Sequence, residues 1–155
     1  MIGLEYVEGF LAEDDVLIGA RVASADRGLV AVGAGAGAGL RFLAATIGAK
    51  AVVEIGTGAG VSGLWLLRGM VPDGVLTSID VDPEHQRAAR TAFTAAGHGP
   101  SRLRLINGMG LDVLPRLCET QPFCAGEARM RQFGGETHCG FADVPQFGRG
   151  GEGCE

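Results

Sequence analysis

The chain has 155 residues, of which 46% are hydrophobic and 20% charged, and its formal net charge is −5. This length corresponds to about one ordinary domain with a hydrophobic core, and the composition argues against wholesale disorder. No apolar run approaches the ~20 residues of a membrane-spanning helix, and acids stand where a signal peptide carries basic residues. We therefore expect a cytoplasmic protein without a membrane partner. Mild acidity without clustered Lys and Arg also argues against nucleic acid as a partner.

The composition changes abruptly near Leu117. Leu, Ile and Val number 34, and 33 of them lie in residues 1–117, whereas residues 118–155 contain only Val144 of this class. We therefore predict a folded part, residues 1–117, and a low-order tail, residues 118–155, with no strand and no helical stripe. The tail holds all four cysteines, but none of them forms the short Cys-x-x-Cys pair typical of zinc sites, so no metal-binding residue is predicted.

The first fifty residues predict helices. In residues 5–22, acids alternate with apolar side chains at a spacing that indicates one amphipathic helix. Residues 33–39 alternate Gly and Ala, which fits either a flexible linker or the entry to a helix. A stripe at i, i+3, i+4 and i+7 follows, made of Leu40, Leu43, Ala44 and Ile47. We expect this stripe to be the packing face of a helix.

After residue 50 the pattern alternates between strands and helices. A short β-branched run predicts a strand at 51–55, and two further strands are predicted at 75–79 and 103–106. Apolar stripes predict helices at 61–69 and 83–96, and a last short helix is predicted at 110–117. This order indicates the N-terminal half of a Rossmann-like, doubly wound α/β fold with a parallel sheet. In that fold a fourth strand lies beside the first, and no run after residue 117 supplies it. We therefore expect residues 51–55 to form an exposed edge that favours homo-oligomerisation or aggregation.

The glycine-rich turn at residues 54–60 is the motif that indicates ligand binding. It reads Glu-Ile-Gly-Thr-Gly-Ala-Gly and connects a predicted strand to a predicted helix, where open α/β sheets bind ligands. The dinucleotide fingerprint G-x-G-x-x-G needs a glycine at position 61, where Val61 stands, so that pattern is imperfect. The form acid-x-G-x-G-x-G fits throughout. Asp80, at the end of the next strand, is placed to accept hydrogen bonds from both hydroxyls of a ribose, and its alternative role is a helix cap or a solvated loop acid.

These residues resemble a known family. The stretches 53–58, 62–66 and 78–84, with a weaker match at 112–117, are similar to class I S-adenosylmethionine (SAM)-dependent O-methyltransferases. Within that class, residues from about 6 to 117 resemble small bacterial enzymes related to catechol and caffeoyl-CoA O-methyltransferases. The resemblance implies transfer of a methyl group from SAM to a hydroxyl of a small, catechol-like acceptor.

The resemblance also implies roles for individual residues. Glu54 would lie by the methionyl amine of SAM, Ser62 would hydrogen-bond its carboxylate, Asp80 would hold the ribose, and Val81 would pack on the adenine. Backbone and contact positions would be Val32, Gly56, Thr57 and Gly58. No catalytic residue is assigned, and Gly110 is expected either near the adenine or simply at a helix start.

The chain departs from the family after residue 117. The family binds a divalent metal, usually magnesium, through an Asp-x-Asp segment and an Asp-Asn pair after its fourth and fifth strands, and neither motif is present. Our hypothesis is that the tail is out of frame or otherwise foreign to the family, which would impair methyl transfer. Two alternatives stay open: a non-catalytic module that retains SAM, and, with less support, an NAD-type oxidoreductase.

Overall fold

A computed structural model gives the structure of the chain and describes residues 3–120. The chain divides into two units, Met1–Arg116 and Leu117–Glu155, and both the sheet and the candidate site belong to the first. The predictions for residues 118–155 lie outside the described residues, apart from the last three residues of helix α6 (Gly110–Thr120).

The sheet is parallel, as predicted. Strands β1 (Ala51–Ile55), β2 (Val75–Asp80) and β3 (Leu103–Asn107) lie in the order β1-β2-β3. The register pairs Ile55 with Ile79, so the carboxyl ends of β1 and β2 lie at the same edge. This confirms the Rossmann-like α/β class for the first unit.

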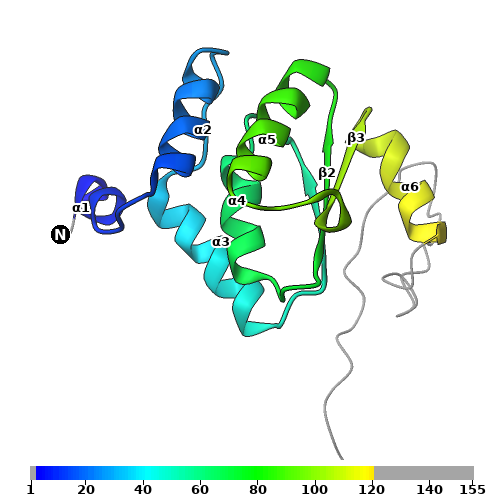
Figure 1. Cartoon of the computed structure of the whole chain (residues 1–155), viewed down its shortest axis with the longest axis horizontal. Coiled ribbons are helices and arrows are strands. Elements are labelled where there is room, and N and C mark those ends of the chain that lie inside the picture. Colours follow the sequence, from blue (N-terminus) through cyan, green and yellow to red (C-terminus); the bar gives the residue numbers. More distant parts are fainter. Residues whose placement is uncertain (1–2, 121–155) are drawn as a thin grey trace, which may run out of the picture. The chain divides into compact units, whose positions relative to one another are not determined.

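Two helices make the connections between the strands. Helix α4 (Val61–Gly69) leads from β1 to β2, and α5 (Pro83–Ala95) together with the short 3₁₀ helix η1 (Pro100–Arg102) leads from β2 to β3. Figure 1 shows α4 and α5 on one side of the strands and α6 on the other. Phe93, Leu64 and Leu76 are completely buried between α4, α5 and β2. The predicted apolar faces of both helices are therefore confirmed.

Among the described residues, β1 has β2 as its one strand partner. Its ends are exposed, with 61% of Ile55 open to solvent. The predicted edge is thus present in the described part of the chain, whereas its pairing with another chain stays a prediction. No helix within residues 3–120 has both the length and the apolar character needed to cross a bilayer.

The N-terminal region differs from the prediction of one helix over residues 5–22. It contains two helices, α1 (Leu4–Gly9) and α2 (Asp15–Ala25), because the extended backbone of Asp14 starts a new helix. The Asp14 Oδ1 atom accepts a hydrogen bond from the Leu17 amide at 3.0 Å, which is the usual contact of a capping residue. Its other oxygen pairs with Arg68 of α4 at 2.6 Å.

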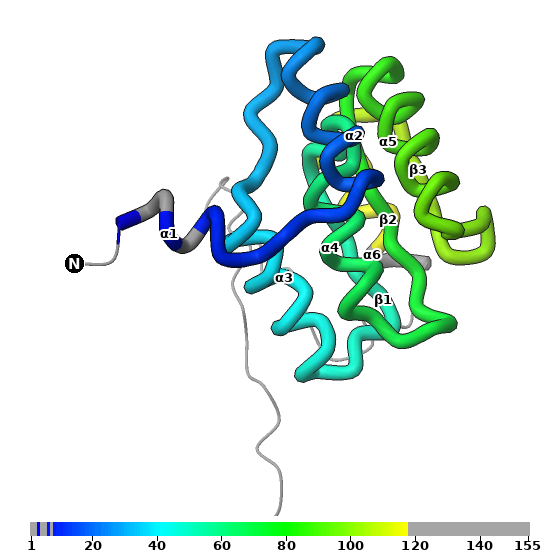
Figure 2. Tube along the Cα trace, turned by 60° about the vertical axis from the view of Figure 1, so that its left-hand side comes forward, coloured from blue at the N-terminus to red at the C-terminus, as the bar shows by residue number. Residues whose placement is uncertain are grey.

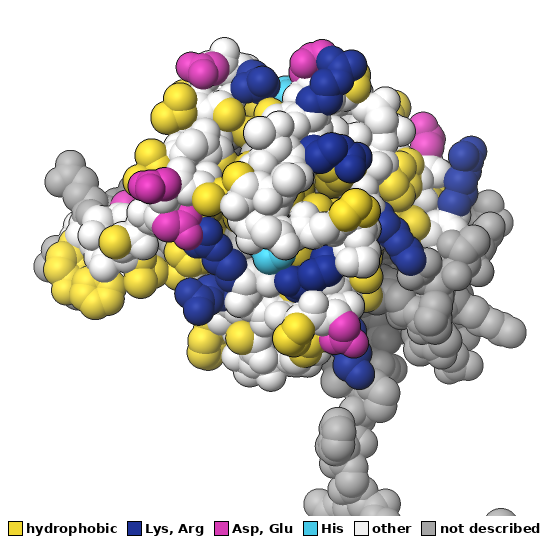
Figure 3. Space-filling model, viewed as in Figure 1, with side chains coloured by type: hydrophobic (Ala, Val, Ile, Leu, Met, Phe, Trp, Pro, Cys, Tyr) yellow, Lys and Arg dark blue, Asp and Glu magenta, His cyan; other side chains and the backbone are white. Residues whose placement is uncertain are grey.

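The apolar face predicted for residues 5–22 is also mostly wrong. Leu17 is completely buried, but Ile18 and Val22 are half exposed. On α1 the rings of Tyr6 and Phe10 lie 5.7 Å apart and are largely exposed, and hydrophobic side chains gather at that helix in Figure 3. The capping residue resets the helical phase, so a single periodicity cannot describe both helices.

Helix α3 (Ala34–Thr46) includes the Gly-Ala run, which excludes a flexible linker. The predicted stripe is wrong in part: Ala44 is buried and Leu40 is half-buried, but Leu43 and Ile47 are 59% and 76% exposed. The buried positions are small, namely Ala34, Gly37 and Ala44. This face packs against α4, and the two helices lie side by side in Figure 2.

Glycines permit this close helix contact. A Cβ atom on Gly37 would overlap the indole ring of Trp65, and one on Gly69 of α4 would overlap the Arg41 carbonyl group of α3. Trp65 is buried and its ring nitrogen donates to Glu13 at 3.3 Å, so the ring is not free to move away. Small residues, rather than the predicted large ones, therefore determine how α3 packs.

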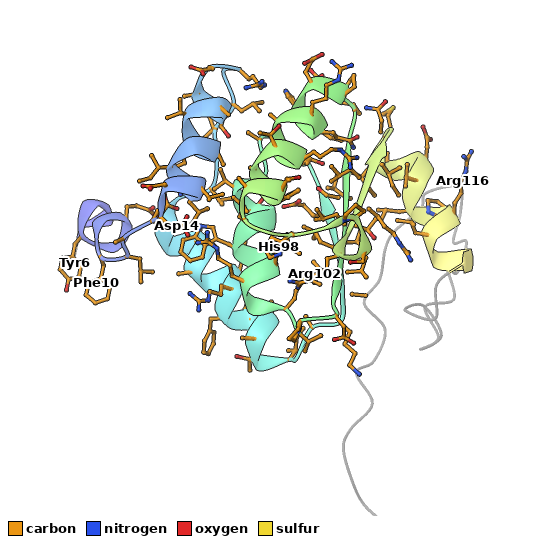
Figure 4. All side chains as sticks on the ribbon, in the orientation of Figure 1. Tyr6, Phe10, Asp14, His98, Arg102 and Arg116 are labelled. Atoms are coloured by element: carbon orange, nitrogen blue, oxygen red, sulfur yellow. The ribbon has the colours of Figure 1, made fainter. Side chains whose placement is uncertain are left out.

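Arg102 binds the end of α4 and the turn that follows it. Its guanidinium group donates to the carbonyl oxygens of Gly74 at 3.1 Å and Val71 at 3.0 Å, and faces the His98 ring at 3.3 Å. Figure 4 shows Arg102 and His98 close together near the middle of the view. One side chain thus binds two carbonyl groups of the turn between α4 and β2, and that of Val71 also accepts from the Gly74 amide at 2.9 Å.

We expect Gly37→Ala to lower the free energy of unfolding by about 1–3 kcal/mol, because the added methyl group overpacks the contact with Trp65. Gly39→Ala is the matched control on the same helix, since a Cβ atom there meets nothing within 4 Å. The free energy of unfolding of the control should rise by about 0.5–1 kcal/mol, because alanine has a higher helix propensity than glycine. Chemical denaturation measures both, and equal stabilities of the two variants would contradict the close contact.

Candidate functional site

The turn after β1 is shaped by three glycines with positive φ. Gly56, Gly58 and Gly60 have φ values of 90°, 51° and 93°, a region that other residues rarely adopt. Gly60 also approaches α5 closely, since a Cβ atom there would lie 3.2 Å from the Ala89 Cα. The third glycine of the motif, Gly60, is therefore needed both for the backbone conformation and for the packing against α5.

Asp80 ends β2 next to this turn. It is 8% exposed, and its Oδ2 atom accepts a hydrogen bond from the Gly58 amide at 3.0 Å. Its Oδ1 atom accepts from the Asp82 amide at 2.9 Å and lies 3.2 Å from the His85 ring. Burial acts to raise the pKa of Asp80, but the Asp82 and Gly58 amides and His85 outweigh it, so the pKa lies below its usual value. Asp80 is therefore a fixed, ionised acceptor.

Glu54 has the opposite electrostatic character. Its carboxylate accepts hydrogen bonds from Ser62 at 2.5 Å and from Ser78 at 2.6 Å. Burial raises the pKa of Glu54 above its usual value, against the effect of these hydroxyl groups, and the charge of Asp80 acts in the same direction as burial. Burial and the Asp80 charge thus disfavour the ionised form of Glu54, and a cationic group beside it would stabilise that form.

Two small cavities lie around the turn, and both include Gly56. One, of about 120 Å³, is lined by Val32, Thr57, Gly58 and Ser62 among others. The second, of about 140 Å³, is lined by Ile55, Asp80, Val81 and Gly110 among others. An elongated ligand could lie across the turn with one end in each.

The structure thus brings all eight predicted site residues to one turn. Val32 packs against the core from the segment before α3, and Val81 is 65% exposed beside the second cavity. Ser62 donates its single hydroxyl proton to Glu54, so a ligand carboxylate would have to compete for that proton. The individual ligand contacts of these residues stay predictions.

Two residues at the turn were missed by the sequence analysis. Ser78 is completely buried in β2 and touches Glu54, and His85 of α5 lies against Asp80. A polar residue in the middle of a buried strand was the available signal for Ser78. His85 had none, because its position depends on where α5 starts after the Asp82 cap.

Two larger grooves lie elsewhere. One, of about 430 Å³, lies between α2 and α5, and the other, of about 450 Å³, is lined by residues 11–14, α3 and α4. Neither is lined by a predicted site residue. The glycine turn is therefore the better candidate, since it combines convergent polar groups with shifted pKa values.

Within residues 3–120, no group of three or more His, Cys, Asp or Glu side chains is placed to hold a metal ion. The divalent metal that the resemblance implies has no matching ligand set in this part of the chain. No chemical step is therefore assigned to a metal. The side chains of the four cysteines are not among those that the structure describes.

Comparisons with known proteins agree on one family. The family model described as O-methyltransferase matches residues 13–127, ending beyond Leu117, where the sequence analysis ended the resemblance. A relative from Mycobacterium tuberculosis, named "Probable O-methyltransferase Rv1220c", is 57% identical over 114 residues, which are 74% of this chain and 51% of that protein. The chain spans about half the length of the curated relatives it matches.

Solved structures give the same result. The O-methyltransferase TomG from Streptomyces achromogenes, involved in tomaymycin synthesis and solved in complex with SAM, has a TM-score of 0.68 and 33% identity, covering 76% of this chain and 52% of that one. An O-methyltransferase from Bacillus cereus in complex with S-adenosylhomocysteine (SAH) has a TM-score of 0.67 and 28% identity, covering 76% and 54%.

Proposed function

The chain belongs to the O-methyltransferase family, and on that premise we propose that it is a SAM-dependent O-methyltransferase acting on a hydroxyl of a small, catechol-like acceptor. The observation that carries the proposal is the Asp80 carboxylate, held ionised beside a glycine turn in the wall of the cavity that Val81 and Gly110 also line. The placement matches the carboxyl edge of a parallel sheet, where such folds bind ligands.

The geometry supports a definite orientation of SAM. Its ribose hydroxyls would donate to Asp80, and its adenine would lie in the cavity beside Val81 and Gly110. Its amino acid would extend past Gly56 toward Val32, with the positive amino group at Glu54.

Methyl transfer needs an acceptor oxygen in line with the transferred group. Bound SAM supplies an electrophilic methyl group on a sulfonium. The described residues bind and orient this cofactor: Asp80 fixes the ribose, and the positive-φ glycines keep side chains out of its path. The acceptor and the group that takes its proton are not assigned to any described residue.

A second candidate function is SAM binding without catalysis. It is favoured by one observation: the residues gathered at the glycine turn account for cofactor binding, whereas none of them is assigned to the acceptor or to its proton. Under the first proposal, we expect transfer to be impaired, because the sequence departs from the family's motifs after residue 117. Both proposals share the same cofactor site and differ only in turnover.

Binding tests the cofactor site. Asp80→Asn should weaken SAH binding about tenfold or more, because it removes a charged acceptor of the ribose hydroxyls. Asp82→Asn is the control, since asparagine also caps a helix and affinity should stay within about twofold. Titration calorimetry measures both, with NAD as a competing ligand. Displacement of SAH by NAD, or equal affinities of the two variants, would contradict the proposed site.

Turnover tests the activity. We expect transfer of radiolabelled methyl groups from SAM to catechols, lowered about tenfold or more by Asp80→Asn at SAM concentrations below its dissociation constant. Mg²⁺ should leave SAH affinity unchanged, because the described cofactor site contains no metal ligand set. SAH binding without any transfer, with and without Mg²⁺, would favour the binding-only function.

A further inference from the structure

Two buried hydroxyl groups lie beneath the glycine turn. Thr57 is 2% exposed and Ser78 is fully buried, and their oxygens are 2.8 Å apart. The Ser78 hydroxyl also donates to Glu54 at 2.6 Å. Ser78 thus connects Thr57 to the carboxylate that is expected to meet the amino group of the cofactor.

The donor in each hydrogen bond among Thr57, Ser78 and Glu54 can be assigned by counting protons. A hydroxyl group has one proton, and an ionised carboxylate can only accept. Because the proton of Ser78 goes to Glu54, the proton between Thr57 and Ser78 must come from Thr57. Thr57 therefore donates to Ser78, and Ser78 donates to Glu54.

This order has a consequence for Glu54. With its acceptor position filled by Thr57, Ser78 keeps its proton directed at the carboxylate, and Ser62 supplies a second proton from α4. Hydrogen bonds to a charged acceptor are stronger than neutral ones and favour the ionised form. Burial and the neighbouring Asp80 charge raise the pKa of Glu54, and the hydroxyl groups of Ser62 and Ser78 oppose this rise.

We propose that Thr57 and Ser78 are positioning residues which, through Glu54, make the site select ligands with a positively charged amino group over otherwise similar nucleosides. The inference rests on the proposed function, since it assumes that SAM lies across this turn. It assigns to Thr57 a side-chain role, in addition to the backbone contact that the sequence analysis gave it.

The test compares two ligands. SAH carries the amino acid, whereas 5′-methylthioadenosine keeps the adenosine and the sulfur but lacks the amino acid. Calorimetry on the full chain measures both ligands for the wild type, Thr57→Val, Thr57→Ser and Ser78→Ala. Valine matches the shape of threonine without the hydroxyl, and serine retains the hydroxyl.

We expect Thr57→Val to weaken SAH about fivefold and Ser78→Ala about tenfold, with 5′-methylthioadenosine changed by less than about twofold. Thr57→Ser should bind both ligands as the wild type does. Equal weakening of both ligands by Thr57→Val, or no weakening of SAH, would overturn the inference while leaving the proposed function intact. A wild type that binds neither ligand would overturn the proposed function and the inference with it.

Discussion

The hydrogen bond from the Gly58 amide to the Asp80 carboxylate connects the turn after β1 to the end of β2, and the site is built around it. It can form because the parallel register brings both strand ends to one edge of the sheet. It also requires a backbone with positive φ on either side of Thr57, which only glycine adopts readily. The glycine motif, the acid on the next strand and the parallel sheet are therefore parts of one constraint.

The same constraint places two carboxylates close together with different properties. Backbone amides and His85 lower the pKa of Asp80, whereas burial raises the pKa of Glu54. One acid is thus a stable acceptor for hydroxyl groups, and the other gains most from a cationic partner. A nucleoside that carries an amino acid offers both kinds of group at its two ends.

The sequence was sufficient to predict the strands, the connecting helices and the turn. Their signals are local: β-branched runs, apolar stripes such as Leu64 and Trp65, and an acid-x-G-x-G-x-G motif. The eight site residues gather at the turn because strand ends of a parallel sheet meet at one edge.

The packing of α3 and the role of Ser78 could not be read in the same way. Helix α3 buries Gly37 rather than Leu43, because the approach of Trp65 from α4 leaves room only for small residues. Ser78 acquires its role from Glu54 on the neighbouring strand. Both are properties of tertiary contacts, which periodicity along the chain does not contain.

A crystal structure of the full chain with SAH tests the central claim most directly, namely that the cofactor lies across the turn at residues 56–60. The account predicts ribose hydroxyls within hydrogen-bond distance of Asp80, adenine beside Val81 and the amino group at Glu54. SAH bound in the groove between α2 and α5, or no bound SAH at saturating concentration, would contradict it.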